Sequence, residues 1–94
     1  MSVRYLALDE LYPDFVDKAA VLIVQLAKNH RLPDGNKRAA WASLRVLVAL
    51  NGWTIEPHPS VDEAGAAVLA IAAGDWDARA TAAWLRPILH RPHP

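Results

Sequence analysis

The chain has 94 residues, enough for one compact domain, and 53% of them are hydrophobic. Ten acidic and ten basic residues give a formal net charge of zero, which argues against a duplex nucleic acid or an anionic membrane as partner. There is no cysteine, so disulfides, thiolate catalysis and cysteine-based zinc sites are excluded. The sequence shows neither a signal-peptide pattern nor an apolar run that could cross a bilayer, so a cytoplasmic soluble domain is expected.

Helical spacing of the apolar residues predicts an all-α, compact helical bundle with about four main helices in a single domain over residues 1–94. Residues 1–10 form a lead-in that could be a short strand or the start of a helix. A first helix is expected from about Pro13 to Lys28, and because it is apolar nearly all round it should be central and buried. Its main apolar face is expected to contain Phe15, Ala19, Leu22, Ile23 and Leu26.

The second helix is expected from about residue 35 to residue 51, after a turn that Pro33 enforces. Asp34 can cap its start, and Gly52 is a good stop for its end. The face that it turns to the core is expected to contain Ala40, Trp41, Leu44, Leu47 and Val48. A short extended piece should follow at residues 53–55.

Two further helices are predicted after the loop at Pro57 and Pro59. Ser60 and Glu63 have capping-box spacing and should open a helix that Gly74 closes. The last helix is expected over about residues 77–89, with Asp75 and Asp77 as caps, and Pro87 should kink or end it. Its apolar side is expected to contain Ala80, Ala83, Trp84 and Ile88, and residues 90–94 should be a frayed tail.

The tryptophans and the histidines of the second half can be explained without a functional site. Trp41 and Trp84 have the helical phase of core residues, whereas Trp53 and Trp76 flank loops and would suit either packing or an interface. The histidines of the second half lack partners at metal-ligand spacing, so no metal site is predicted from His58, His90 and His93.

The chemically active side chains are concentrated in residues 30–38, where the two central helices should join. The start of a helix has unpaired backbone N–H groups and a partial positive charge, which together bind anions. Gly35 allows close approach of a ligand, and Arg38 has the forked cation that suits phosphate oxygens. Asn36 adds an amide and Lys37 a point charge. A phosphate-bearing ligand fits this set best.

A carboxylate and an imidazole complete the set. Asp34 beside bound phosphates is favourable when Mg²⁺ lies between them, so it is a candidate magnesium ligand. His30 could act as a general base on an attacking hydroxyl, which together with nucleotide phosphates indicates phosphoryl or nucleotidyl transfer. The alternative is structural: Asp34 as a helix cap, His30 as a surface imidazole, and the two cations as a solvated face.

The stretch resembles the signature of the Fic/Doc family, His-Pro-Phe-x-Asp/Glu-Gly/Ala-Asn-Gly/Lys-Arg, at His30, Asp34, Gly35, Asn36 and Arg38. The segments 11–14, 18–20, 50–52 and 83–85 are similar to the Doc branch. Two positions favour the Doc branch over the adenylyl-transferring members of the family. Lys37 stands where the adenylyl-transferring members carry glycine, and Trp41 stands where they carry a second arginine.

The resemblance implies the Fic/Doc helical fold and a Doc-like toxin of a toxin–antitoxin system. Such toxins use Mg²⁺ and ATP to transfer the γ-phosphate to a threonine of elongation factor Tu, which inhibits translation. By analogy, His30 would be catalytic and Asp34 would hold the metal, while the phosphates would be bound by Gly35, Asn36, Lys37 and Arg38.

Compared with the family, the chain looks shortened between residues 10 and 11, where the N-terminal helix and the flap that docks the target would lie. The face left open by such a shortening should associate with a Phd-like antitoxin or with a second copy of the chain. The alternative function is therefore a flap-less Fic-fold binding module with little or no catalysis, and adenylyl transfer ranks third.

Overall fold

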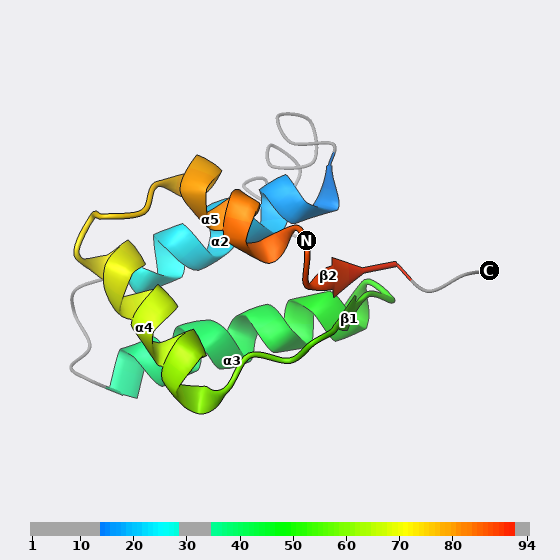
Figure 1. Cartoon of the computed structure of the whole chain (residues 1–94), viewed down its shortest axis with the longest axis horizontal. Coiled ribbons are helices and arrows are strands. Elements are labelled where there is room, and N and C mark those ends of the chain that lie inside the picture. Colours follow the sequence, from blue (N-terminus) through cyan, green and yellow to red (C-terminus); the bar gives the residue numbers. More distant parts are fainter. Residues whose placement is uncertain (1–13, 29–34, 92–94) are drawn as a thin grey trace.

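The computed structural model describes residues 14–28 and 35–91, which contain four α-helices and one small two-stranded sheet (Figure 1). In chain order the elements are α2 (Phe15–Ala27), α3 (Gly35–Leu50), β1 (Thr54–Ile55), α4 (Val61–Ala72), α5 (Ala78–Leu85) and β2 (Leu89–His90). The two strands are antiparallel, with Thr54 opposite His90 and Ile55 opposite Leu89. The predicted all-α bundle with about four main helices is confirmed.

Local capping explains where these helices begin. The side chain of Asp14 accepts a hydrogen bond from the Val16 N–H at 2.8 Å and caps α2. Ser60 and Glu63 form the predicted capping box at α4. Asp77 caps α5 by accepting from the Ala80 N–H at 2.8 Å, whereas Asp75 is exposed and caps no described helix. Two other expected start signals, Pro13 and Asp34, lie outside the described residues.

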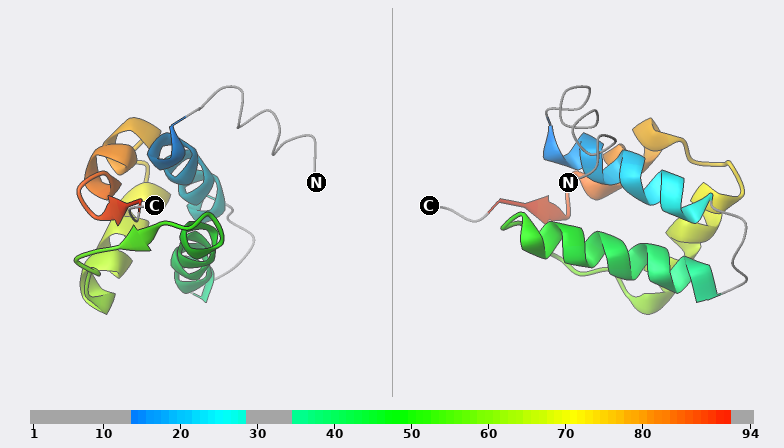
Figure 2. Two further views of the ribbon diagram at one scale, coloured as in Figure 1. Left: turned by 90° about the vertical axis from the view of Figure 1, so that its right-hand side faces the viewer. Right: turned by 180° about the vertical axis from the view of Figure 1, so that it is seen from behind.

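The central helices α2 and α3 lie side by side and run antiparallel, so that the end of α2 and the start of α3 are at the same end of the molecule (Figures 1 and 2). α4 packs across α3, and α5 packs on α2. The core between them is made of small and branched apolar side chains, led by the fully buried Ile23, Leu44, Ile71 and Leu85. None of the described helices is both long and apolar enough to cross a membrane.

The predicted core face of α2 needs a correction. In α2, Ala19 and Ile23 are buried as expected, but Phe15, Leu22 and Leu26 are only half-buried. The buried face is turned slightly and also contains Val16, Ala20 and Ala27. This helix is apolar nearly all round, so periodicity alone does not select the face that meets α5 and α3. In α3, Ala40, Leu44 and Val48 are buried as expected, while Trp41 and Leu47 are half-buried and pack against the core.

For the last helix, the expected stop at Pro87 is confirmed, whereas the range to about residue 89 and part of the predicted face were wrong. α5 ends at Leu85 and not near Leu89, because Pro87 has no N–H to continue the helical bonding. Ala80 and Ala83 are exposed, and the buried side chains are Thr81, Ala82 and Leu85. Ile88 lies beyond the end of the helix, so it does not belong to a helical face. Leu89 is the first residue of β2.

The tryptophans all pack against the core. Trp53 stacks on Phe15 with ring centroids 4.7 Å apart. Trp41, Trp84 and Trp76 form a row in which adjacent centroids are 5.8 and 5.7 Å apart. Packing, rather than exposure at an interface, is therefore the role of Trp53 and Trp76 in this chain.

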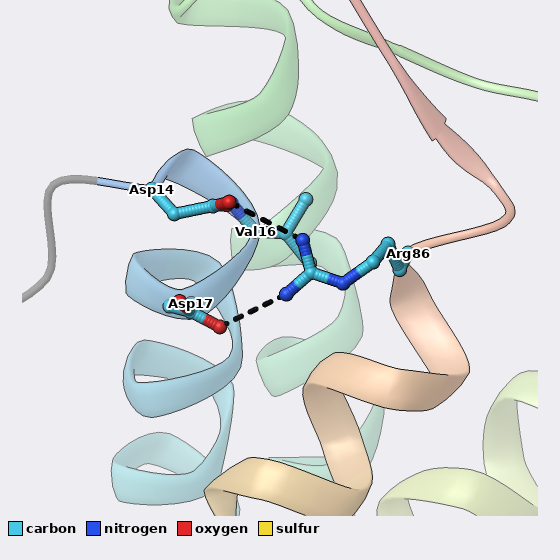
Figure 3. A network of polar contacts seen from close by, with 4 residues as sticks. All are labelled: Asp14, Val16, Asp17 and Arg86. Carbon is cyan, nitrogen blue, oxygen red and sulfur yellow. Dashed lines mark hydrogen bonds and ion pairs between the residues drawn. The ribbon is translucent and has the colours of Figure 1, made fainter.

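Arg86 ties the end of α5 to the start of α2 (Figure 3). Its Nη1 donates to Asp14 Oδ2 at 3.2 Å and its Nη2 donates to Asp17 Oδ1 at 3.1 Å. Partial desolvation raises the pKa of Asp14, but the Val16 N–H and the Arg86 guanidinium outweigh it, so this pKa lies below its ordinary value of 3.8.

We predict that the Arg86→Gln variant loses stability at neutral pH and that this difference disappears in acid. A carboxyl with a depressed folded pKa stabilises the fold above its unfolded pKa, and this stabilisation is lost as pH falls through the folded pKa. Because the three side chains are about half exposed, the loss should be only about 0.2–1 kcal/mol per pair.

Urea unfolding at about pH 7 and about pH 2.5 checks this expectation. The matched control is Arg79→Gln on the same helix, whose side chain is exposed and makes no ion pair with any described residue. Equal stability differences for Arg86→Gln at the two pH values would contradict the prediction.

Candidate functional site

The predicted phosphate-binding residues lie at the start of α3, at the end of the molecule where α2 finishes (Figure 1). Gly35, Asn36 and Lys37 form the first turn of this helix, and their side chains lie outside the described part of the structure. Arg38 is described and exposed. The predicted base His30 and the predicted magnesium ligand Asp34 both lie in the segment 29–34, outside the described residues.

Arg38 opens onto a groove between α3 and α4, which we call the α3–α4 groove. Its volume is about 630 Å³. One wall comes from α3 and contains Arg38, Trp41 and Arg45, and the other comes from α4 and includes Gly65 and Leu69. The size falls within the range of roughly 300–1,000 Å³ that is usual for small-molecule sites.

The α3 wall of the groove carries two positive charges. Arg38 and Arg45 are two helical turns apart, and both are exposed. Neither forms a hydrogen bond or an ion pair with any residue in the described ranges 14–28 and 35–91. Asp62, in the first turn of α4, is the one carboxylate among the lining residues. The described lining therefore favours a ligand with negative charge near α3.

Trp41 lies between the two arginines in the sequence of α3, and its ring packs against two other rings. Its ring and that of His58 pack edge-to-face, with a centroid distance of 6.1 Å and an interplanar angle of 85°, and it contacts Trp84 at 5.8 Å. The His58 Nδ1 is 3.0 Å from the carbonyl oxygen of Pro59. These contacts favour one orientation of the indole, which forms an apolar surface beside the arginines.

The groove includes features that sequence reasoning missed. Arg45 was not singled out, although the spacing of Arg38, Trp41 and Arg45 at i, i+3 and i+7 places the three on one side of a helix. The α4 wall could not be found from spacing, because its packing against α3 is a tertiary contact. Within residues 14–28 and 35–91, no three histidine or carboxylate side chains come close enough together to hold a metal ion.

Comparison with known proteins gives two matches. The profile described as the Fic/DOC family matches residues 1–48. The chain is also 41% identical over 76 residues to the protein named Toxin Doc of Mycolicibacterium smegmatis (strain ATCC 700084 / mc(2)155). That match covers 81% of this chain and 58% of the relative, so the chain spans little more than half of the relative's length. No solved structure matches significantly.

Proposed function

Because the chain belongs to the Fic/Doc family, we propose that it is a Doc-like toxin that transfers the γ-phosphate of Mg-ATP to a threonine of a protein. By family analogy the target is elongation factor Tu, and the consequence is inhibition of translation. The similarity to a Doc toxin supports the class of protein, and the groove beside Arg38 supports nucleotide binding.

The observation that carries the proposal is the position of Arg38. This cation lies in the first turn of α3, where free backbone N–H groups favour an anion, and it lines the α3–α4 groove. A cation at the positive end of a helix is unfavourable unless an anion binds nearby. A nucleotide satisfies both features, because its phosphates reach the start of α3 while its base and ribose enter the groove.

The proposed step assigns one role to each residue of the motif. His30 takes the proton of the threonine hydroxyl, whose oxygen attacks the γ-phosphorus. The bond to the bridging oxygen of the β-phosphate breaks, and ADP leaves. Asp34 anchors Mg²⁺, which offsets the charge of the phosphates. The phosphate oxygens are bound by the first turn of α3, through Gly35, Asn36, Lys37 and Arg38.

The partner in a toxin–antitoxin pair would be a Phd-like antitoxin. A second candidate function, a binding module with little catalysis, is favoured by apolar side chains on the surface. Val46 and Leu50 are 56% and 80% exposed on α3, and Val61 is 84% exposed on α4. Unpartnered apolar groups of this kind suit an interface with an antitoxin or with a second copy of the chain.

Incubation of the chain with Mg²⁺, a cell extract and labelled ATP tests the proposal. Label from the γ-position on an extract protein supports phosphotransfer. Transfer of label only from the α-position would indicate adenylyl transfer and overturn it. Absence of label from either position, together with tight binding of a protein from the extract, would favour the binding module. Expression in a bacterial host should cause growth arrest if the toxin assignment is correct.

A further inference from the structure

Arg45 is the one cation of the α3 wall that the family motif does not include. It lies seven residues after Arg38, which corresponds to about 10 Å along the helix axis. Both side chains line the groove, and neither has a hydrogen-bonding partner among the described residues. An exposed guanidinium beside a groove and next to an indole is suited to bind a ligand rather than to stabilise the fold.

The surroundings of Arg45 are suited to a flat apolar group. Trp41 precedes it by one turn, and the facing wall is made of small or aliphatic side chains such as Ala66, Val68 and Leu69. Gly65 adds space, since a Cβ placed there would meet nothing within 4 Å. Phosphate groups would gain little from such walls, whereas an aromatic base would bury apolar area and could stack on a guanidinium plane.

We propose that Arg45 holds the nucleoside end of the ligand, while Arg38 holds its phosphate end. Arg45 would thus determine specificity for a nucleotide over a ligand made of phosphates alone. This inference rests on the proposed function, because it takes the ligand to be a nucleotide. In this arrangement the nucleotide extends along α3 from the helix start. Its base lies against Trp41, and the Arg45 guanidinium stacks on the base or donates to its acceptor atoms.

The two roles are separated by comparing ATP with inorganic triphosphate, which has the phosphates but no nucleoside. Calorimetric titration in the presence of Mg²⁺ should show that Arg45→Gln weakens ATP binding roughly tenfold and leaves triphosphate binding unchanged. Arg38→Gln should weaken both ligands. Arg79→Gln, which removes an exposed arginine away from the groove, should weaken neither.

A second variant tests the groove without removing a charge. Gly65→Leu places a side chain in open space on the α4 wall, so the fold should tolerate it, as circular dichroism would verify. It should reduce the affinity for ATP and spare that for triphosphate, because only the nucleoside enters this part of the groove.

Two outcomes would overturn the inference and leave the proposed function standing. In the first, Arg45→Gln binds ATP as tightly as the wild type. In the second, the variant loses affinity for ATP and triphosphate equally, which would make Arg45 another phosphate contact. If the wild-type chain binds triphosphate but not ATP, the inference fails together with ATP as the co-substrate. The labelling experiment then reports separately on transfer.

Discussion

Replacement of His30 by alanine should lower the rate of γ-phosphate transfer by roughly 10²–10⁴-fold, the usual contribution of a general base. The proposed function assigns this imidazole to the proton of the attacking hydroxyl and gives it no contact with the base or ribose. Affinity for ATP should therefore stay close to that of the wild type. Transfer from γ-labelled ATP and calorimetric ATP binding measure the two effects separately, and growth arrest on expression should be lost.

The control for this experiment is Gln25→Ala, which removes an exposed polar side chain from α2, the helix that leads towards the motif. It should leave transfer and growth arrest unchanged. Full transfer by His30→Ala would remove the general-base role. Loss of transfer and of ATP binding together would instead indicate that His30 shapes the site.

Leu44→Ala should destabilise the fold by about 2–5 kcal/mol, the usual cost of emptying a leucine site in a core. Leu44 is fully buried at the middle of α3, the helix that packs on both α2 and α4. A domain of this size is stabilised by only about 5–15 kcal/mol in total, so this loss is a large part of it. Urea unfolding followed by circular dichroism measures the change.

Leu50→Ala on the same helix provides the matched control. Leu50 is 80% exposed, so the same chemical change should alter the free energy of unfolding by no more than about 0.5 kcal/mol. Similar losses for the two variants would mean that Leu50 is covered in solution, for example by association of the chain with itself. Unfolding at several protein concentrations would distinguish that case.

Sequence reasoning located most of the helix ends because they carry local signals. The capping box of Ser60 and Glu63 and the left-handed glycines Gly52 and Gly74, with φ of 76° and 87°, need no tertiary information. The face of α5 was missed because an eight-residue helix has barely two turns over which a period could be recognised. Trp84 and Ile88 do pack against the core but are only half-buried, and the fully covered positions are Thr81, Ala82 and Leu85.

The candidate site could be predicted only in part, because its motif is local in sequence whereas its groove depends on contacts between helices. Its motif lies within nine consecutive residues, 30–38, and the chemistry of these side chains together with the family resemblance suggests their roles. The family is confirmed by the matches to known proteins, whereas the roles of His30, Asp34 and the phosphate-binding residues stay predictions. The groove could not be predicted, because Trp41 and Leu69 line it together only through the packing of α4 on α3.

The circular dichroism of the row formed by Trp41, Trp84 and Trp76 can be used to follow ligand binding at the proposed site. Indoles less than 6 Å apart are close enough for their electronic transitions to couple, and Trp41 belongs both to this row and to the groove wall. A base that stacks on Trp41 would change the signal of all three rings. Occupancy of the groove can therefore be followed in the unlabelled wild-type chain, with a Trp84→Phe variant identifying the part of the signal that depends on the row.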